Sequence, residues 1–352
     1  MQAISKTIID WYQVNKRELP WRDTRDAYKI WISEIILQQT RVNQGMNYYL
    51  RFVERFPDVK SLANADEEEV LRYWQGLGYY SRARNLHKAA LQIMDRYDGI
   101  FPSQFSEVIS LSGIGTYTAS AICSFANNQP YAVVDGNVYR VLARYFGIET
   151  PIDSTSGVKQ FAGLANAILD GENAGLHNQA LMEFGALQCV PVSPDCHNCP
   201  LIHSCKAFEH NLVATLPIKE KKVKVKERFF NYLFINQNEN TFLQKRINND
   251  IWKNLYEFPL IETEKPMSID ELIAHNDFIA LFEGIEDLNI NSISAPVKHI
   301  LTHRIIYATF VTIEIKRTNK QFENLTQTPI SELQNFAVSR LIDLFLQNRE
   351  KR

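Results

Sequence analysis

SLSGIGTYTASA (residues 110–121) and VVDGNV (residues 133–138) are the most informative stretches of this sequence. In the first, Gly113 and Gly115 lie between a leucine and a helical pattern that begins at about Thr116. Because the first N–H groups of a helix lack partners within it, such a turn can bind an anion without a basic side chain. A lone Gly-x-Gly turn is common. The longer LxGxGxxTA frame favours a hairpin that holds the phosphate of a nucleic acid, whatever its base sequence.

Asp135 in the second stretch opens the next predicted helix. An aspartate at this position caps a helix by accepting hydrogen bonds from backbone N–H groups. The helix dipole also favours the ionised form of a carboxylate there, and an anion stabilises a cationic sugar transition state. Capping and catalysis are compatible, so the sequence leaves both roles open.

A long helix is predicted over residues 27–56. On it Ile30, Glu34 and Leu37 share one face, because residues three and four apart stack along a helix. A carboxyl group in an apolar stripe loses water, which raises its pKa and suits a general acid. Periodicity alone favours the alternative, in which Glu34 lies at the edge of the stripe with its head group in water.

The stretch GLGYYSRARNLHKAA (residues 76–90) combines two glycines with Tyr79, Tyr80 and Arg82. Glycines allow close backbone approach, and arginines with aromatic rings suit phosphates and unstacked bases. The alternative is a turn between helices with a solvated basic face. Further helices are predicted over residues 66–73, 103–111 and 157–188.

Composition sets broad limits. The 352 residues predict two to three domains, and 45% hydrophobic with 22% charged residues is typical of a globular protein. No apolar run approaches the length of about 20 residues that spans a bilayer, and no signal peptide is recognised, so we expect a cytosolic location, with the nucleoid if the source is bacterial. A net charge of −2 means that nucleic-acid binding must come from local patches.

Cys189, Cys196, Cys199 and Cys205 form a C-x6-C-x2-C-x5-C pattern. In a reducing compartment this clustering predicts a metal site rather than disulfides. Four thiolates suit zinc or a 4Fe–4S cluster, and the single CxxC pair favours iron–sulfur only modestly. Cys123 lies in an apolar helical stretch and is predicted to be a core residue.

Beyond residue 213 the chain changes character. Residues 214–228 contain a proline and a lysine run and are predicted to be a basic linker, facing DNA or simply solvated. Period-two alternation then predicts an α+β domain that is distinct from the helical part. Its predicted strands cover 228–236, 240–247, 252–260 and 305–315, and its predicted helices cover 268–282 and 331–347.

Together these motifs resemble the helix–hairpin–helix DNA glycosylases that carry an iron–sulfur cluster, and more narrowly the MutY family of adenine DNA glycosylases. The resemblance extends from about Leu19 to Cys205, and more loosely over the C-terminal domain. It is carried by LPWR (19–22), WISEIILQQTRV (31–42), GLGYYSRARNLHKAA (76–90), LSGIGTYTA (111–119), VVDGNVYRV (133–141), NQALMEFGA (178–186) and the four-cysteine loop.

The resemblance implies a multidomain α and α+β protein, with an all-helical helix–hairpin–helix core and a C-terminal Nudix-like domain. The implied divisions are an iron–sulfur subdomain (1–24 with 131–213), a six-helix barrel (25–130), the linker (214–228) and the Nudix-like domain (229–352). A monomer is expected, with no membrane partner.

The implied activity is removal of adenine mispaired with 8-oxoguanine or guanine in double-stranded DNA, after the base has left the stack. The resemblance makes Glu34 the acid that protonates adenine, Asp135 the carboxylate beside the sugar, and the four cysteines the ligands of a 4Fe–4S cluster. It places Trp21, Arg22 and Glu183 around adenine, Asn137 and Tyr117 near Asp135, and Tyr79, Tyr80, Gln38 or Gln39 where the base has left.

The residue at position 117 distinguishes the MutY family from the similar endonuclease III type. The similar endonuclease III type carries a lysine there, which forms a Schiff base and cuts the strand. Here no lysine occurs between Lys88 and Lys159. We therefore expect a glycosylase with little or no lyase activity. A thymine-damage glycosylase-lyase is disfavoured, and a lesion-binding module without activity is the alternative that the intact Glu34 and Asp135 argue against.

FLQKRINNDIWKNLYEFP (residues 242–259) resembles the opening of the Nudix-like domain in this family. The glutamate-rich R-E-x-x-E-E helix is missing after it, so we expect no hydrolysis of nucleoside diphosphates. Leu301, Thr302 and His303 stand where the family has a Phe-Ser-His loop for 8-oxoguanine. The same three residues could instead form a turn that enters a strand.

Overall fold

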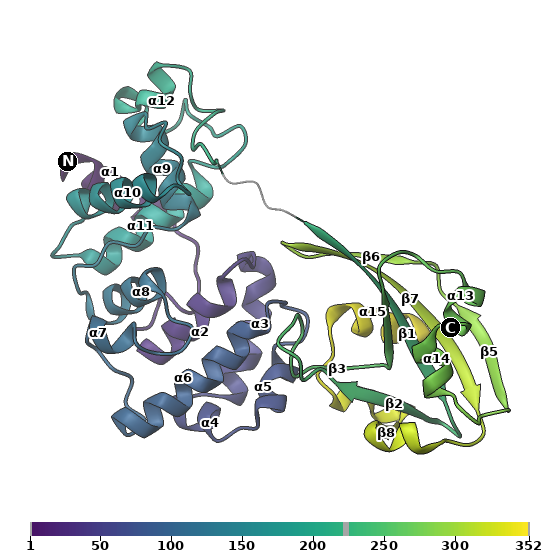
Figure 1. Ribbon diagram of the computed structural model, residues 1–352. Helices are drawn as coiled ribbons and strands as arrows, with labels where there is room; N and C mark the ends of the chain where they lie inside the picture. Colours follow the sequence, from purple (N-terminus) through teal and green to yellow (C-terminus); the bar gives the residue numbers. More distant parts are fainter. Residues whose placement is uncertain (1, 221–224, 351–352) are drawn as a thin grey trace. The chain divides into compact units, whose positions relative to one another are not determined.

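The chain forms two compact units (Figure 1), and the computed structural model describes residues 2–220 and 225–350. The first unit contains Met1–Asn64 and Asn85–Lys221, and the second contains Ala65–Arg84 and Lys222–Arg352. Ala65–Arg84, which the sequence analysis assigned to the helical barrel, therefore belongs with the C-terminal residues. Residues 221–224 of the predicted linker lie outside the described residues.

The first unit is helical. It contains α1 (Gln2–Asn15), α2 (Ala27–Leu37), α3 (Val42–Arg55), α4 (Val59–Ala63), α7 (Phe105–Val108), α8 (Thr116–Asn127), α9 (Gly136–Phe146), α10 (Thr155–Ile168), α11 (Ala174–Leu187), a 3-10 turn (Ile202–Ser204), α12 (Lys206–Glu209) and most of α6 (Ser81–Tyr97). Within it, α2 packs on α3 and α8, and α11 packs on α1, α8 and α9.

The predicted single helix over residues 27–56 is wrong. Asp26 caps α2 by accepting a hydrogen bond from the Tyr28 N–H, and the helix ends at Leu37. Gln39 then takes a left-handed conformation (φ 57°), which an α-helix cannot continue through, and α3 starts at Val42. The predicted helix over 103–111 is likewise reduced to α7.

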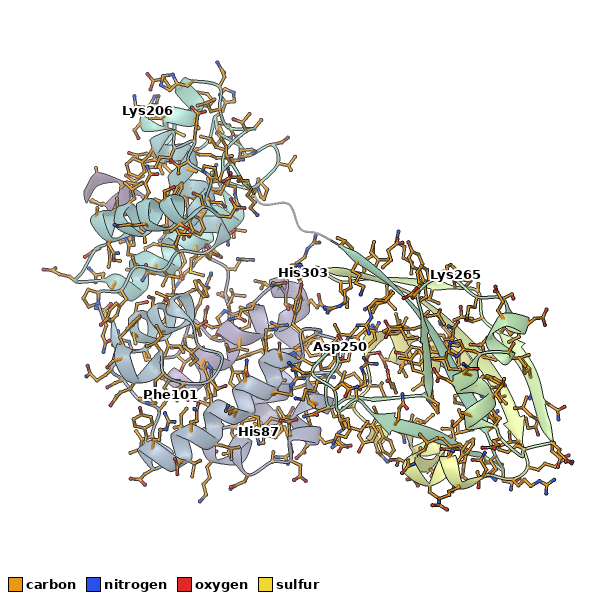
Figure 2. All side chains as sticks on the ribbon, in the orientation of Figure 1. His87, Phe101, Lys206, Asp250, Lys265 and His303 are labelled. Atoms are coloured by element: carbon orange, nitrogen blue, oxygen red, sulfur yellow. The ribbon has the colours of Figure 1, made fainter. Side chains whose placement is uncertain are left out.

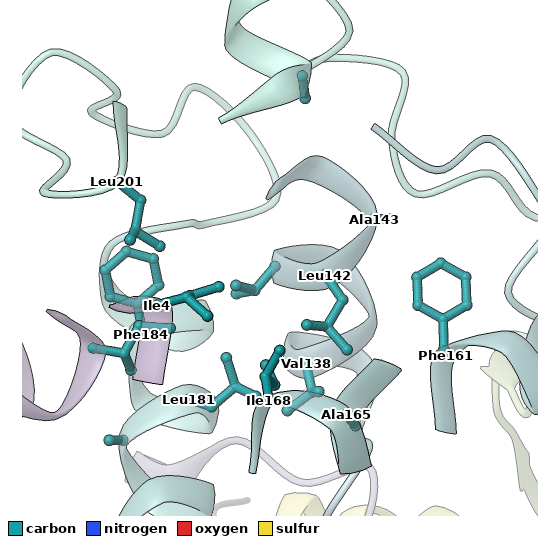
Figure 3. Close-up of a cluster of buried hydrophobic side chains, with 14 of the residues drawn as sticks. Ile4, Val138, Leu142, Ala143, Phe161, Ala165, Ile168, Leu181, Phe184 and Leu201 are labelled. Atoms are coloured by element: carbon teal, nitrogen blue, oxygen red, sulfur yellow. The ribbon is translucent and has the colours of Figure 1, made fainter. Parts of the chain in front are cut away.

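One core cluster of the first unit joins the N-terminal helix to residues far along the chain. Ile4 of α1 belongs to the same buried cluster as Val138, Leu142, Phe161 and Leu181 (Figure 3). Each of these side chains is almost fully buried. Burial of apolar side chains from α1, α9, α10 and α11 is therefore what attaches the first helix to the segment that begins near residue 131.

The predicted hairpin precedes α8. Gly113 has a φ of +77°, and a Cβ added there would lie 2.6 Å from the Cβ of Asn85. Gly115 is the N-cap of α8 with an ordinary φ of −97°, and a Cβ there meets no atom within 4 Å. Glycine therefore suits the two positions for different reasons. Gly113 needs a left-handed backbone and close packing, whereas Gly115 leaves the helix N-terminus open.

The second unit is built on strands. They are β1 (Lys226–Asn236), β2 (Asn240–Lys245), β3 (Tyr256–Glu257), β4 (Leu260–Thr263), β5 (Leu288–Ile293), β6 (Val297–Ile300), β7 (Arg304–Ile315) and β8 (Thr326–Pro329). The main sheet has the order β4-β1-β7-β5, with β6 also paired to β7, and β3-β2-β8 form a smaller sheet. β1 and β7 run parallel along their whole length, and β4, β5 and β6 pair antiparallel.

Helices cover both faces of the main sheet (Figure 1). On one face Phe310 stacks on Phe345 of α15 (Arg340–Glu350), with ring centroids 4.1 Å apart. On the other face Val311 packs with Phe278 of α14 (Asn276–Leu281). Successive residues of β7 therefore serve opposite faces, as the period-two pattern predicts.

Several predicted elements of the second unit change in detail. The strand over 305–315 is confirmed as β7, and that over 228–236 begins slightly earlier, at Lys226. The strand predicted over 252–260 is reduced to β3 and the first residue of β4, and residues 252–254 form a turn. The helix over 268–282 is two short helices, α13 (Ile269–Ile273) and α14, and that over 331–347 divides into a 3-10 turn (Ile330–Asn335) and α15. A 3-10 turn (Lys320–Asn324) and α5 (Glu67–Tyr73) complete the unit.

Within the part of the chain that the structure describes, no helix is long and apolar enough to cross a membrane.

The Gly113 hairpin gives a stability prediction. Gly113→Ala should lower the free energy of unfolding by about 1–3 kcal/mol, because alanine must adopt a positive φ and its Cβ meets Asn85. Gly115→Ala is the matched control and should change stability by only about 0.5 kcal/mol. Urea unfolding followed by circular dichroism measures both. Equal losses in the two variants would contradict the assigned difference.

Candidate active site

A cavity of about 540 Å³ in the first unit brings most of the predicted site residues together. Its walls come from α2, α8, α9, α11 and the segment before α2. The predicted residues that line it are Trp21, Arg22, Glu34, Gln38, Gln39, Tyr117, Asp135, Asn137 and Glu183. Residues from both ends of the helical unit thus face one space.

Glu34 is buried, with 7% of its surface exposed, so the alternative with its head group in water is wrong. The Tyr117 hydroxyl donates a hydrogen bond to its Oε2 at 2.8 Å. Burial raises the pKa of Glu34 to about 7, against the lowering effect of Tyr117 and with a further increase from the charge of Asp135. Glu34 therefore retains a proton close to neutral pH, as a general acid must.

Asp135 caps α9, as predicted. Its Oδ1 accepts a hydrogen bond from the Val138 N–H at 2.8 Å, and its Oδ2 accepts one from the Asn137 side chain at 2.8 Å. Burial raises the pKa of Asp135, while these N–H groups and the charge of Arg140 act to lower it. Burial is the largest influence on the pKa of Asp135, and it opposes the ionised form that the helix N-terminus favours.

Arg140 holds Asn137 in place, and the sequence analysis did not single it out. Its Nη2 donates to the Asn137 Oδ1 at 2.9 Å and to the Gly185 carbonyl at 2.7 Å. Its Nε donates to the Cys189 carbonyl at 2.7 Å. The only signal in the sequence is its position three residues after Asn137 on a helix, which is too common to be informative.

Glu183 lies at the centre of a buried ion-pair group. Arg17 donates to it through Nε at 2.8 Å and Nη2 at 2.5 Å, and Arg22 donates through Nη2 at 2.7 Å. Burial alone would raise the pKa of Glu183, but hydrogen bonds from the two arginines lower it to about 2. Arg17 was not predicted. It lies just before the LPWR motif, and only its contact with Glu183 reveals it.

Trp21 and the two glutamines complete the cavity. Trp21 is 7% exposed and its ring meets Tyr49 edge-on, with centroids 5.1 Å apart. The Gln38 side chain donates to the Thr118 hydroxyl at 3.3 Å. Because the helix ends before them, Gln38 and the left-handed Gln39 lie at the cavity rather than on a helix face.

The four clustered cysteines are free thiols, each half-buried. Cys189, Cys199 and Cys205 pack against the core cluster of α1, α9, α10 and α11. Burial, together with the nearby thiols of Cys189, Cys205 and Cys196, raises the pKa of Cys199 to about 11, so the four cysteines lie near one another. The guanidinium of Arg144 lies 3.5 Å from the Cys189 Sγ.

These thiols do not converge as they would on a single ion. Among the described residues, no three His, Cys, Asp or Glu side chains are arranged to hold one metal ion. The donor set itself, four cysteines beside a buried arginine, suits thiolate ligands with a shared negative charge. Cys123, by contrast, is fully buried in α8, which confirms its prediction as a core residue.

The remaining predicted residues lie in the second unit. Tyr79 is 44% exposed, has a left-handed φ of 48°, and shares a hydrogen bond with the hydroxyl of Thr302. Leu301–His303 form the turn between β6 and β7, closed by the Leu301 N–H donating to the Arg304 carbonyl at 2.8 Å. Together they line a cavity of about 830 Å³.

Tyr80 and Arg82 are neighbours of Tyr79 with different surroundings. Tyr80 is 3% exposed and donates its hydroxyl proton to the Val338 carbonyl at 3.1 Å, so of the two tyrosines only Tyr79 presents an exposed ring. The Arg82 guanidinium lies over the rings of Trp74 and Tyr79, at 5.2 and 5.6 Å from their centroids. Cation–π contacts of this kind hold a ring in place.

Comparison with known proteins supports the assignment of both units. Residues 32–162 match the HhH-GPD superfamily of base excision DNA repair proteins, and residues 231–348 match the NUDIX domain. A thermostable thymine-DNA glycosylase superposes with a TM-score of 0.55 at 28% identity, over 59% of this chain and 96% of that one. Endonuclease III in complex with DNA shares the fold, with a TM-score of 0.52 at 23% identity over 60% and 95% of the two chains.

Several similar curated proteins have the name adenine DNA glycosylase. That of Buchnera aphidicola subsp. Acyrthosiphon pisum is 38% identical over 74% of this chain and 75% of its own. That of Buchnera aphidicola subsp. Baizongia pistaciae is 35% identical over 94% and 91%. The protein of Homo sapiens is 41% identical over 58% and 39%.

The helical fold, its cavity and the matched domains define a helix–hairpin–helix DNA glycosylase of base excision repair, joined to a NUDIX-type domain. Enzymes of this class hydrolyse N-glycosyl bonds in DNA. The chain belongs to the adenine DNA glycosylase family, which confirms the MutY resemblance and the predicted multidomain α and α+β fold.

The buried Glu34 predicts a pH dependence of stability. Its pKa is about 7 in the folded chain and 4.5 ordinarily. The folded state therefore binds the proton more tightly, and this stabilisation is complete below pH 4.5 and is lost as the pH rises through 7. Between pH 4.5 and 7, the free energy of unfolding of the wild type should fall by up to about 3 kcal/mol relative to that of Glu34→Gln.

Thermal melts of both proteins from pH 5 to 8 provide the measurement. The wild-type melting temperature should fall with rising pH relative to that of Glu34→Gln, and the difference should level off above pH 7. Parallel curves would mean that Glu34 has an ordinary pKa.

Proposed function

We propose that this protein removes adenine paired with 8-oxoguanine or guanine from double-stranded DNA. The observation that carries the proposal is the cavity in which the protonated Glu34 and the hydrogen-bonded Asp135 face the same space. The adenine must leave the base stack to reach them, which costs a few kcal/mol. The cavity volume of about 540 Å³ is of the size that takes small ligands.

Glu34 supplies the proton in the proposed mechanism. Adenine is a poor leaving group unless it is protonated at N7, so a neutral carboxylic acid must act as the donor. A pKa of about 7 keeps a large fraction of Glu34 protonated near neutral pH. Tyr117 occupies Oε2 with its hydrogen bond, which leaves Oε1 to carry the proton toward the base.

Asp135 acts on the sugar. Departure of adenine leaves an oxocarbenium-like sugar, which an anionic carboxylate stabilises electrostatically or captures covalently. Asp135 accepts N–H hydrogen bonds from Val138 and Asn137, whereas Glu34 accepts a hydroxyl. Such N–H bonds favour the charged form, and on this ground we assign the anionic role to Asp135.

Glu183 with Arg17 and Arg22 orients the base. The Glu183 carboxylate already accepts hydrogen bonds from Arg17 and Arg22 on both oxygens, so it acts by fixing the two guanidinium groups. The arginines have further N–H groups with which to approach the ring nitrogens. Trp21 closes the cavity with an apolar surface that suits the flat base.

The DNA backbone is held by the hairpin of Gly113 and Gly115. The open N-terminus of α8 presents unpaired N–H groups, and a phosphate oxygen is a suitable acceptor. Since the net charge is −2, the contacts that bind DNA are local. In the second unit, we assign the reading of 8-oxoguanine to Tyr79 and the turn Leu301–His303.

Strand cleavage is not part of the proposal. Tyr117 occupies the position where the endonuclease III type has its lysine, and a phenol cannot form a Schiff base. The function is therefore that of a monofunctional glycosylase that leaves an abasic site in an intact strand.

We also propose that Cys189, Cys196, Cys199 and Cys205 hold a 4Fe–4S cluster. The support is the donor set, because four cysteines lie near one another beside the Arg144 guanidinium and thiolates are the ligands of iron–sulfur clusters. Such a cluster fixes the loop that carries its ligands. Arg140 and Arg144, which bond to this loop, then hold it against α9.

Asp135→Asn tests the catalytic role directly. Excision from an adenine·8-oxoguanine duplex should fall by at least about 100-fold, because the amide cannot stabilise the cationic sugar. Asparagine also caps helices well, so α9 and DNA binding should be retained. The wild-type product strand should remain intact until it is treated with alkali.

The control is Asp58→Asn, which alters the cap of α4 away from the cavity and should keep full activity. Loss of DNA binding with Asp135→Asn would make the residue structural. A wild type that binds the mispair but never releases adenine would support the lesion-binding module.

Cys199→Ala tests the cluster. The purified variant should lose iron, acid-labile sulfide and visible colour, and its affinity for DNA should fall. Cys123→Ser is the matched control, since this buried fifth cysteine lies outside the group and should leave the iron content unchanged. Zinc in place of iron in the wild type, or a colourless and fully active Cys199→Ala, would contradict the assignment.

A further inference from the structure

The segment of residues 249–254, between β2 and β3, lies beside the cavity that we assign to 8-oxoguanine. Asn249, Asp250, Ile251 and Trp252 line this cavity together with Tyr79 and the turn Leu301–His303. All belong to the second unit, and Figure 2 labels Asp250 and His303 there. The function proposed above gives this segment no role.

Asp250 joins three strands through arginines. Its carboxylate accepts from Arg228 Nη1 on β1 at 2.7 Å and from Arg246 Nη2, just after β2, at 3.0 Å. Arg304 Nη2 lies 3.6 Å from its other oxygen. Arg304 is the first residue of β7 and follows His303 directly. One carboxylate thus ties the end of the turn to the rest of the sheet.

The three arginines differ in the salt bridges that they would retain if Asp250 lost its charge. Arg228 also pairs with Glu262 at 2.6 Å, and Arg246 with Glu257 at 2.8 Å. Among the ion pairs of the described residues, Asp250 is the partner of Arg304. Removing the charge of Asp250 therefore releases Arg304, while two further salt bridges continue to hold β1 and β2.

Trp252 contacts the other strand of the hairpin. Its ring lies 5.9 Å from the ring of His299 on β6 and 6.1 Å from that of Phe230 on β1, centroid to centroid. Residues 249–254 therefore hold β7 through Arg304 and β6 through His299. These are the two strands that Leu301–His303 connect.

The same segment also holds the part of the unit that carries Tyr79. The Lys253 carbonyl accepts from Arg84 Nη1 at 2.8 Å, and the Asn254 amide donates to Glu67. Trp252 and Asn254 both have left-handed backbone, with φ of 59° and 66°. Strained conformations of non-glycine residues persist where the surroundings fix them, and they cluster at ligand sites.

We propose that Asp250 is a positioning residue for lesion discrimination. By holding Arg304, it sets the place of Thr302 against Tyr79, and so the strength of the preference for adenine opposite 8-oxoguanine over adenine opposite guanine. This inference rests on the proposed function, which assigns 8-oxoguanine to Tyr79 and Leu301–His303. In this proposal Asp250 acts through Arg304.

Asp250→Asn tests the proposal, because it removes the charge and keeps the size. Single-turnover excision should be measured on matched duplexes with adenine opposite 8-oxoguanine and opposite guanine. The rate opposite 8-oxoguanine should fall about threefold to fivefold, the effect of one partly exposed ion pair. The rate opposite guanine should stay within about twofold. Asp250→Glu should restore part of the preference.

Two controls separate positioning from loss of structure. Asp287→Asn breaks a comparable ion pair with Arg317, 3.9 Å long, and should leave the preference unchanged. Arg304→Gln should reduce the preference as Asp250→Asn does, and the double variant should be no worse than either single one. Equal losses on both duplexes, or additive losses in the double variant, would overturn the inference.

The wild type and Thr302→Val complete the test. Suppose that the wild type prefers 8-oxoguanine and that Thr302→Val weakens this preference, while Asp250→Asn leaves it intact. This result overturns the inference about Asp250 and leaves the proposed function standing. A wild type that shows no preference overturns the assignment of 8-oxoguanine to this cavity as well. Thermal melting of each variant shows whether the unit has remained folded.

Discussion

The site depends on keeping the Glu34 carboxyl group out of water. In its buried position the charged form of Glu34 loses its hydration, and one hydroxyl from Tyr117 does not replace it. Asp135 shares the same space but accepts hydrogen bonds from the N–H groups at the start of α9. The two carboxyl groups therefore differ in the donors that each can reach, and the proposed division into acid and anion rests on this difference.

Much of the fold could be predicted where apolar periodicity and a capping residue coincide. Asp135, which caps α9, and the alternating residues of β7 are examples. The prediction failed at Gln39, because the break between α2 and α3 has no glycine or proline to mark it. The short strands β5 and β6 were missed since most of their residues are exposed and they are ordered by pairing with β7.

The site residues also divide into those that the sequence predicts and those that it does not. Glu34 and Asp135 lie within motifs that can be recognised from the chain itself, and the cavity contains both. Arg17 and Arg140 could not be found in this way. Arg17 acts through Glu183, 166 positions away, and Arg140 through a backbone carbonyl 49 positions away. Side chains that matter through distant partners leave no local pattern, and only the folded chain reveals them.

The assignment of Ala65–Arg84 to the second unit affects how the chain is made. This segment leaves the ribosome long before Lys222–Arg352, with which it forms a compact body. The sheet also cannot close until β7 emerges to pair in parallel with β1. Domains tend to fold in the order of synthesis. Here the helical unit can complete itself early, while Ala65–Arg84 must wait for the C-terminal residues to be translated.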